Sequence, residues 1–537
     1  MSQPPKTELE KRLHNLWKIL LESEDFGVDD NFFQLGGGSV QAMRLVSMAR
    51  REGLTMTVGG VFKTPTLREL ALTVRENVST EEVAPFSLLR DLKVSDLKHQ
   101  AALQCGVSIK EIEDAYPLSA MQMHYITGYP ESKKDISGPW DWQSQVVYSL
   151  PSSIDLDRFK QIWISAICRH QTLCTRLVYT SSGIFQVVLR EPDPFEWSKA
   201  TDLEQYLRED RASHMRFGSR LIRLTIIQSE DSPSTLFVMT IHHTIYDAFA
   251  RNILFKELEN AYLQDPLSDA PRPKMNHFIK YIIQADKAAA TDFWTSYLAK
   301  AVIKPLLTIP EGSPLPLNIK EKKISMNIPK LQGLSNEGIT LPTIIEVAIG
   351  LTLANYLCSP DIILYSDVSG RNLPVDGLPD LIGPTTLFLP VRIHLSPTQP
   401  LSGLLSEHQA SKTQALPYEY LGFLELREMP HLKDMLKNSL NMNINPNPLK
   451  KIGRSWGLEY MQDWASCDDP FGVNVDLDEE TGEMEWGIYW DERFLGEDVV
   501  GKLLEGIVRV FGKVAEGLGS GREGITVGEV LAPEGLV

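Results

Sequence analysis

The chain has 537 residues, of which 43% are hydrophobic and 23% are charged, a composition that excludes a fully disordered protein. At about 150 residues per domain, the length predicts three or four compact units. Lys and Arg number 53 against 70 Asp and Glu, so the net charge is -17, and nucleic acid is not an expected partner because such a surface would repel its phosphates.

The amino terminus, MSQPPKTELE, lacks a basic region followed by an apolar core, so no secretory signal is expected. The most apolar long stretch, residues 341–358, contains Pro342, Glu346 and Asn355, which is typical of a buried core helix rather than a membrane span. The five cysteines are odd in number and scattered, which indicates neither a zinc site nor a disulfide framework. We therefore expect a cytoplasmic protein without a membrane partner or a metal.

Residues 1–78 are predicted to form a small helical unit. Apolar side chains recur at helical spacing from Leu9 to Leu20, and a second helix is predicted from Val40 to Arg51. The segment FKTPT at residues 62–66 breaks the chain, and a further helix is predicted over residues 67–78 with Thr66 as its N-cap. Residues 79–109 carry mixed charge, and we interpret them as a linker.

The remainder of the chain alternates strands with helices. Apolar runs at residues 236–241, 362–368 and 387–395 predict buried strands, and a long amphipathic helix is predicted at residues 499–518. This pattern indicates α/β or α+β architecture, and its length is too great for one small core.

The first candidate site is the segment DNFFQLGGGSV at residues 30–40. Its three glycines let the backbone bend freely, and Ser39 is placed where a helix begins. A phosphodiester on Ser39 would meet unpaired N–H groups and the positive end of the helix dipole. By spacing alone, Ser39 could equally be a simple N-cap.

This segment resembles the carrier signature DxFFxLGG(H/D)S of thiolation (peptidyl carrier) domains in nonribosomal peptide synthetases, with Gly38 at the position usually held by His or Asp. The resemblance implies an all-α four-helix carrier domain. It also implies that Ser39 carries a covalent 4'-phosphopantetheine arm, which a separate phosphopantetheinyl transferase installs.

The second candidate site is HHTIYDA at residues 242–248, directly after an apolar strand. Since side chains alternate along a strand, His242 and His243 should point to opposite sides, and only one should face a substrate. Asp247 falls at the predicted strand-to-helix turn, where a carboxylate can cap the helix or orient a neighbour. Adjacent histidines on opposite faces chelate a metal poorly, and without further context a structural histidine is the more common interpretation.

This motif resembles HHxxxDG of condensation domains, which are similar to chloramphenicol acetyltransferase, and companion motifs follow in the family order. They are YPLSAMQ at 116–122, RHQTLCT at 169–175, GRN at 370–372, IGP at 382–384 and LPVR at 389–392. The resemblance spans roughly residues 112–518. It implies an α/β condensation domain with an amino-terminal lobe at residues 110–300 and a carboxy-terminal lobe at residues 301–537.

The resemblance assigns the catalytic position to His243 and a structural one to His242. It makes Asp247 a salt-bridge partner that holds the loop, with Arg371 as the first candidate for its partner and Arg392 as the second. Removal of such a buried partner would damage geometry more than chemistry.

The implied reaction is acyl transfer from a thioester on the arm to an amine. The motifs HHxxYD and GRNLPV also resemble those of the terminal, cyclising domains of fungal synthetases, such as those of fumiquinazoline type. We therefore expect the didomain to cyclise and release a peptidyl thioester that upstream synthetase modules supply. The alternatives are elongation with an amine on a downstream carrier, ester formation with a hydroxyl, and a non-catalytic docking module.

Overall fold

The computed structural model describes most of the chain. The described residues are 3–21, 23–37, 39–76, 82–90, 92–127, 140, 142–190, 195–229, 234–263, 272–302, 304–307, 318–327, 339–429, 432, 440–445, 452–465, 469–478, 481–519 and 524–532. Within these ranges, no helix is both long enough and apolar enough to cross a membrane.

The amino-terminal domain contains four helices in its described part, which agrees with the expected helical fold. They are α1 (Glu8–Leu21), α2 (Ser39–Arg51), α3 (Val58–Lys63) and α4 (Leu67–Thr73). Trp17 and Phe32 lie at the centre of its core, with both side chains fully buried. Helix α3 was not predicted: it precedes most of the expected break at residues 62–66, and it begins where Thr57 accepts a hydrogen bond from the Gly60 N–H.

The last carrier helix is shorter than predicted. It ends at Thr73 rather than near residue 78, and the short strand β2 (Arg75–Glu76) then pairs with β1 (Leu54–Thr55). The linker segment, residues 79–109, also contains more structure than its composition indicated. Helix α5 (Val94–Cys105) and the 3-10 helix η1 (Ile109–Glu111) lie in or at the end of it, and the core side chains of α5 pack against the neighbouring sheet.

The amino-terminal lobe is built on two sheets. In the described residues, the larger sheet has the order β14-β4-β9-β8-β7 and the smaller one the order β3-β6-β5. The strand bounds are β3 (Ile112–Pro117), β4 (Gln143–Leu150), β5 (Thr175–Thr180), β6 (Gly183–Leu189), β7 (Ser198–Ala200), β8 (Ile222–Gln228), β9 (Thr235–His242) and β14 (Glu459–Ala465). The helices are α6 (Ala120–Thr127), α7 (Leu156–Arg169), η3 (Gln171–Cys174), α8 (Leu203–Ala212), η4 (His243–Ile245) and α9 (Ala248–Leu263).

The carboxy-terminal lobe is built on one sheet, whose described strands have the order β10-β16-β15-β13-β11-β12. The strand bounds are β10 (Ile319–Asn327), β11 (Asp361–Val368), β12 (Leu387–His394), β13 (Leu440–Asn445), β15 (Phe471–Leu477) and β16 (Glu483–Asp491). Its helices are α13 (Leu341–Leu357), η6 (Leu378–Asp380), α14 (Leu401–Ala415), η7 (Leu416–Tyr418), α15 (Phe423–Arg427), α17 (Glu497–Gly519) and α18 (Val527–Leu531). The 3-10 helix η9 (Arg454–Trp456) packs instead against α9 of the amino-terminal lobe. Helix α13 confirms the predicted core helix, because every residue from Thr343 to Ala354 is buried.

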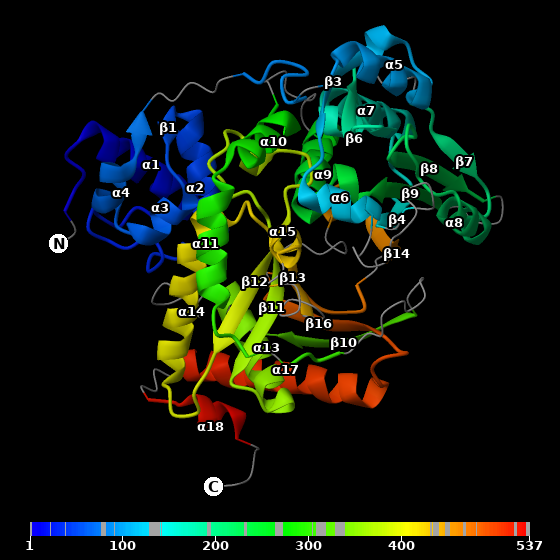
Figure 1. The fold of residues 1–537 in the computed structure, drawn as a ribbon. Coiled ribbons are helices and arrows are strands. Elements are labelled where there is room, and N and C mark those ends of the chain that lie inside the picture. The colour runs from blue at the N-terminus through cyan, green and yellow to red at the C-terminus, as the bar shows by residue number, and fades with distance from the viewer. Residues whose placement is uncertain are drawn as a thin grey trace.

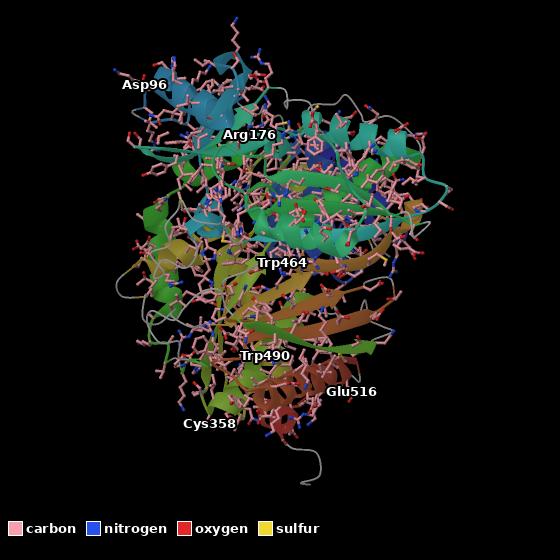
Figure 2. The ribbon with its side chains drawn as sticks, turned by 90° about the vertical axis from the view of Figure 1, so that its right-hand side faces the viewer. Asp96, Arg176, Cys358, Trp464, Trp490 and Glu516 are labelled. Atoms are coloured by element: carbon pink, nitrogen blue, oxygen red, sulfur yellow. The ribbon has the colours of Figure 1, made fainter. Side chains whose placement is uncertain are left out.

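The two lobes exchange elements, so a division at residue 300 is too simple. Strand β14 comes from the second half of the chain but pairs antiparallel with β4 in the first lobe. Helices α10 (Met275–Gln284) and α11 (Lys287–Leu298) belong to the first half but share a core with Tyr365 and Leu389 of the second. Figure 2 shows Trp464 of β14 at the level where the two lobes meet.

The carrier domain lies against the carboxy-terminal lobe. Helix α3 contacts α14, and α2 contacts η6. In Figure 1 the carrier domain, in blue, lies beside α11 and α14. A Cβ atom placed on Gly59 would lie 3.3 Å from Leu416 Cδ1, so the backbone of α3 approaches this lobe closely.

Candidate functional site

The two histidines lie where β9 ends and η4 begins, and they occupy different environments. His242 is fully buried, its ring centroid is 5.5 Å from that of Trp140, and its Nδ1 lies 2.9 Å from Thr244 Oγ1. His243 is partly exposed and lines a cavity of about 1120 Å³. The chain therefore directs only the second imidazole into open space, as strand alternation predicted.

Aromatic rings hold the imidazole of His243. Its ring stacks on Tyr246 with centroids 4.4 Å apart, and its Nε2 lies 3.2 Å from the Tyr246 hydroxyl. Tyr125 and Trp142 contact it from other sides, at centroid distances of 5.4 Å and 5.8 Å. The backbone N–H of His243 donates to the Trp142 carbonyl, and Trp142 adopts a left-handed φ of 65°.

Burial and charge make His243 a weak base. Burial lowers its pKa to about 4, the positive charge of Arg251 lowers it further, and the carboxylate of Asp247 partly opposes both. The imidazole is therefore neutral at pH 7. A neutral imidazole can accept a hydrogen bond from an amine, but it would not take a proton from an ammonium ion.

Asp247 does not contact the ring; it fastens the loop that carries it. Its Oδ1 accepts from the Ala250 N–H at 2.7 Å, which caps α9, and its Oδ2 accepts from the Thr385 N–H at 2.8 Å and from Arg371 Nη1 at 3.0 Å. Burial alone would raise the pKa of Asp247, but Arg371 and these amides hold it below its usual value. The carboxylate is thus a fixed negative charge that joins the two lobes.

The partner of Asp247 is the first of the two arginine candidates. Arg371 also donates through Nη2 to the Leu381 carbonyl at 2.9 Å, so its guanidinium spans the GRN and IGP segments. Arg392, the second candidate, pairs instead with Asp361, with Nη2 and Oδ2 2.8 Å apart. Arg392 faces Asp361 because these two side chains lie on the paired strands β12 and β11.

Ser39 is the first residue of α2, at the helix start expected from the sequence. A Cβ on Gly37 would lie 2.4 Å from the Phe32 ring, and Gly36 has a φ of +97°, so this turn depends on both glycines. The turn and the first part of α2 reach the cavity. Carrier residues along its wall include Phe33, Leu35, Gly36, Gly37, Gln41 and Arg44.

One cavity therefore borders both candidate sites. It is lined by residues on either side of Ser39 in the carrier domain and by His243 in the larger region. A covalent arm on Ser39 fits this arrangement, because the helix start offers N–H groups to a phosphate and the cavity runs on to the imidazole. Among the described residues, no group of three or more His, Cys, Asp or Glu side chains could hold a metal ion.

Several residues of this site carried no role in the sequence interpretation. Tyr246 lies inside the quoted motif, yet its contact with His243 depends on the turn of η4. Trp464 reaches the cavity only because β14 crosses to the other lobe, and Glu419 lines it from the segment after η7. The positions of Trp464 and Glu419 arise from tertiary structure, and no local pattern marks them.

Comparison with known families agrees with both motifs. A family model described as "Condensation domain" matches residues 112–503, and one described as "Phosphopantetheine attachment site" matches residues 11–74. The chain is 31% identical over 528 residues to FR901469 synthetase of Dothideomycetidae sp. (strain 11243), covering 94% of this chain and 3% of that protein. It is 30% identical over 528 residues to nonribosomal peptide synthetase ecdA of Aspergillus rugulosus, covering 94% of this chain and 7% of that protein. The chain thus spans a small part of these relatives.

Solved structures share the fold. The crystal structure of holo T3CT matches with a TM-score of 0.63 at 21% identity, over 80% of this chain and 98% of that chain. The starter condensation domain of rhizomide synthetase matches with a TM-score of 0.60 at 13% identity, over 77% of this chain and 96% of that chain. At these identities, the likeness supports the predicted fold class alone.

Proposed function

Because this chain belongs to the condensation-domain family and carries a phosphopantetheine attachment domain, we propose that it joins the amine and the thioester of one peptide held on Ser39. The product would be a ring released from the carrier. Condensation domains catalyse amide formation by acyl transfer, and the relatives are fungal nonribosomal peptide synthetases. The proposed partners are upstream synthetase modules and a phosphopantetheinyl transferase, and the proposed location is the cytoplasm.

The observation that carries this proposal is the shared cavity. Carrier residues beside Ser39 and the imidazole of His243 border the same space of about 1120 Å³. Sites for small ligands usually have volumes of roughly 300–1,000 Å³, so this space is large enough to hold a tethered ligand. When bound to Ser39, the phosphopantetheine arm supplies a thioester as the acyl donor.

His243 positions the attacking amine. A free α-amine has a pKa of about 7.7–8.0, so a sizeable neutral fraction exists near pH 7. Since the pKa of His243 is lowered to about 4, the imidazole takes the amine proton only as the C–N bond forms and the nitrogen of the amine becomes acidic. Placement of reactants can supply about 7–11 kcal/mol, and proton acceptance adds about 10²- to 10⁴-fold in rate.

The neighbouring residues keep His243 in position. Tyr246 contacts Nε2 through its hydroxyl, and burial raises the pKa of Tyr246 to about 12, so the phenol stays protonated. His242 packs under the strand end, and Asp247 fastens the loop through Arg371. We assign positioning roles to Tyr246, His242 and Asp247.

The test is to load Ser39 with candidate peptidyl-pantetheines and to identify the product by mass spectrometry. We expect a product lighter than the hydrolysed peptide by one water, formed without any added carrier. His243→Ala should slow its formation by about 10²- to 10⁴-fold in single turnover.

Other outcomes would favour the other functions. Turnover that needs an aminoacyl group on an added carrier would indicate elongation, for which the much greater length of the relatives is the supporting observation. An unchanged rate in His243→Ala would contradict the role of the imidazole. A product that incorporates a hydroxyl rather than an amine would indicate ester formation, and no product in any arm would indicate docking.

A further inference from the structure

A second polar pair lies in the wall of the same cavity, and the proposed reaction does not use it. Glu419, which follows η7, is only 4% exposed, and Asn372 follows Arg371 in the GRN segment. Both residues line the cavity. Two buried oxygens, Glu419 Oε2 and Asn372 Oδ1, have no hydrogen-bond partner among the described residues.

The two side chains interact through a hydrogen bond, and this bond determines which of their polar atoms are left without a partner. The Asn372 side chain hydrogen-bonds the Glu419 carboxyl group. Because Asn372 Oδ1 and Glu419 Oε2 are both unpaired, that bond joins Asn372 Nδ2 to Glu419 Oε1. Asn372 therefore presents a free acceptor, and Glu419 presents a free oxygen beside it.

The free oxygen of Glu419 is a donor near neutral pH. Burial raises the pKa of Glu419 to about 8, while Lys412 and the Asn372 hydrogen bond oppose that shift only in part. The carboxyl group is thus mostly protonated at pH 7 and carries an O–H. One donor and one acceptor, side by side, complement the C=O and N–H of a secondary amide.

Each member of the pair is close in sequence to a residue with an established contact. Leu416, three residues before Glu419, is the residue that Gly59 of the carrier approaches. On the other side, Asn372 adjoins Arg371, whose guanidinium holds Asp247 and so the loop of His243. An amide bound here would occupy the cavity that carrier residues and His243 also line.

We propose that Glu419 and Asn372 bind one secondary amide of the tethered cargo, with Glu419 donating to its carbonyl oxygen and Asn372 Oδ1 accepting from its N–H. This inference rests on the proposed function, because the cargo enters this cavity only from Ser39. Secondary amides occur both in the pantetheine arm and in the peptide. Such a site would discriminate against a ligand without an amide, because that ligand would leave the buried polar groups of Glu419 and Asn372 unpaired.

Binding without turnover tests the pair. In a chain carrying Ser39→Ala, the affinity for free pantetheine is measured by titration calorimetry, with an alkyl thiol of similar length but without amides as the comparison ligand. We expect Glu419→Gln, which keeps an N–H donor at the same place, to bind pantetheine as the parent does. Glu419→Leu and Asn372→Leu should each lose about 3- to 10-fold in affinity, with no change for the alkyl thiol.

Rates identify which amide is bound. Peptidyl thioesters of pantetheine and of the alkyl thiol are compared in the chain without the Ser39→Ala change. A Glu419→Leu defect confined to pantetheine esters assigns the arm, and a defect with both esters but none in pantetheine titration assigns the peptide. Urea denaturation checks that each variant is folded. If Glu419→Leu does not fold, Asn372→Leu tests the site on its own.

The outcomes also separate this inference from the proposed function. If Glu419→Leu and Glu419→Gln behave alike in both assays, the amide site is wrong even where ring formation depends on His243. If no ring forms but pantetheine binding still follows the donor at Glu419, the amide site stands and cyclisation fails.

Discussion

Arg371 Nη1 lies 3.0 Å from Asp247 Oδ2, although 124 positions separate the two residues in the chain. Both side chains are only 3% exposed. Asp247 caps α9 in the first lobe, and Arg371 belongs to the loop after β11 in the second, so the pair fastens the two lobes beside His243.

Loss of one partner should therefore destabilise the fold. We expect Arg371→Met to lower the free energy of unfolding by about 3–5 kcal/mol, because it leaves the Asp247 carboxylate buried without its cation. Urea denaturation followed by fluorescence measures this change. The double variant Arg371→Met with Asp247→Asn should recover part of the loss, since neither charge then remains.

Lys11 supplies the control for this prediction. It lies 3.7 Å from Glu8 in an ion pair whose side chains are 55% and 81% exposed. Lys11→Met should cost no more than about 1 kcal/mol. A cost for Arg371→Met as small as this would show that the buried pair contributes little to holding the lobes together.

Gly370 precedes Arg371 in a conformation that requires glycine. Its φ is +65°, and a Cβ there would lie 1.8 Å from the Thr385 carbonyl oxygen. Gly370→Ala should thus displace the Thr385 loop, lower the free energy of unfolding by more than about 1 kcal/mol and slow single turnover. Chemical denaturation and the mass assay measure the two effects.

Gly403 in α14 is the matched control, because a Cβ there meets nothing within 4 Å. Gly403→Ala should stabilise the protein by about 0.5–1 kcal/mol through its higher helix propensity. If Gly370→Ala were as well tolerated as Gly403→Ala, the close backbone approach at Thr385 would not constrain the site.

The parts of the site that follow from local pattern were predictable from the sequence. The apolar run before His242 marks β9, and strand alternation predicts that only one imidazole faces the cavity. The start of α2 at Ser39 follows from glycines placed before a helical repeat. The family motifs added the Asp247 partner, because a contact across 124 positions leaves no local signal.

The remainder depends on tertiary contacts. The sequence of β14 gives no sign that this strand joins the other lobe. Trp464 reaches the cavity because β14 pairs with β4. Helix α5 was not predicted, because its buried side chains, such as Leu97 and Ala101, are few and lie among polar residues. The raised pKa of Glu419 likewise arises from burial that no local pattern reports.

Glu346 of α13 gives a prediction for stability against pH. His408 Nε2 and Lys412 Nζ each lie 2.7 Å from its carboxylate, and although burial would raise its pKa, these two groups lower it to about 2. A carboxyl group with a depressed folded pKa stabilises the fold above its unfolded pKa of about 4.3, and this contribution is lost as pH falls towards 2. At about 1.4 kcal/mol per unit, the contribution is about 3 kcal/mol.

Glu346→Gln removes this titration. We expect the difference in unfolding free energy between the parent and Glu346→Gln to be largest above pH 4.5 and to shrink as the pH is lowered, measured by urea titrations at several pH values. Glu8→Gln, at a carboxylate that is 81% exposed, should leave the pH dependence of the parent unchanged. A difference that stays constant with pH would contradict a charged Glu346.

Arg251 provides the test of how His243 is kept neutral. The residue is only 8% exposed, and its Nε and Nη2 have no hydrogen-bond partner among the described residues. After burial, its charge is the next largest cause that lowers the pKa of His243 to about 4. Because removal of a positive charge favours the protonated imidazole, Arg251→Met should raise the pKa of His243.

The change should appear in two measurements. The ¹⁵N chemical shifts of His243 should titrate near pH 4 in the parent and at higher pH in Arg251→Met. The single-turnover rate falls first as the amine becomes protonated below about pH 8, and its second decrease, where His243 becomes protonated, should move to higher pH in the same way. Arg158→Met on α7 is the control, because Arg158 is not among the charges that shift this pKa. A His243 titration that stays in place in Arg251→Met would mean that desolvation, and not the charge of Arg251, keeps the imidazole neutral.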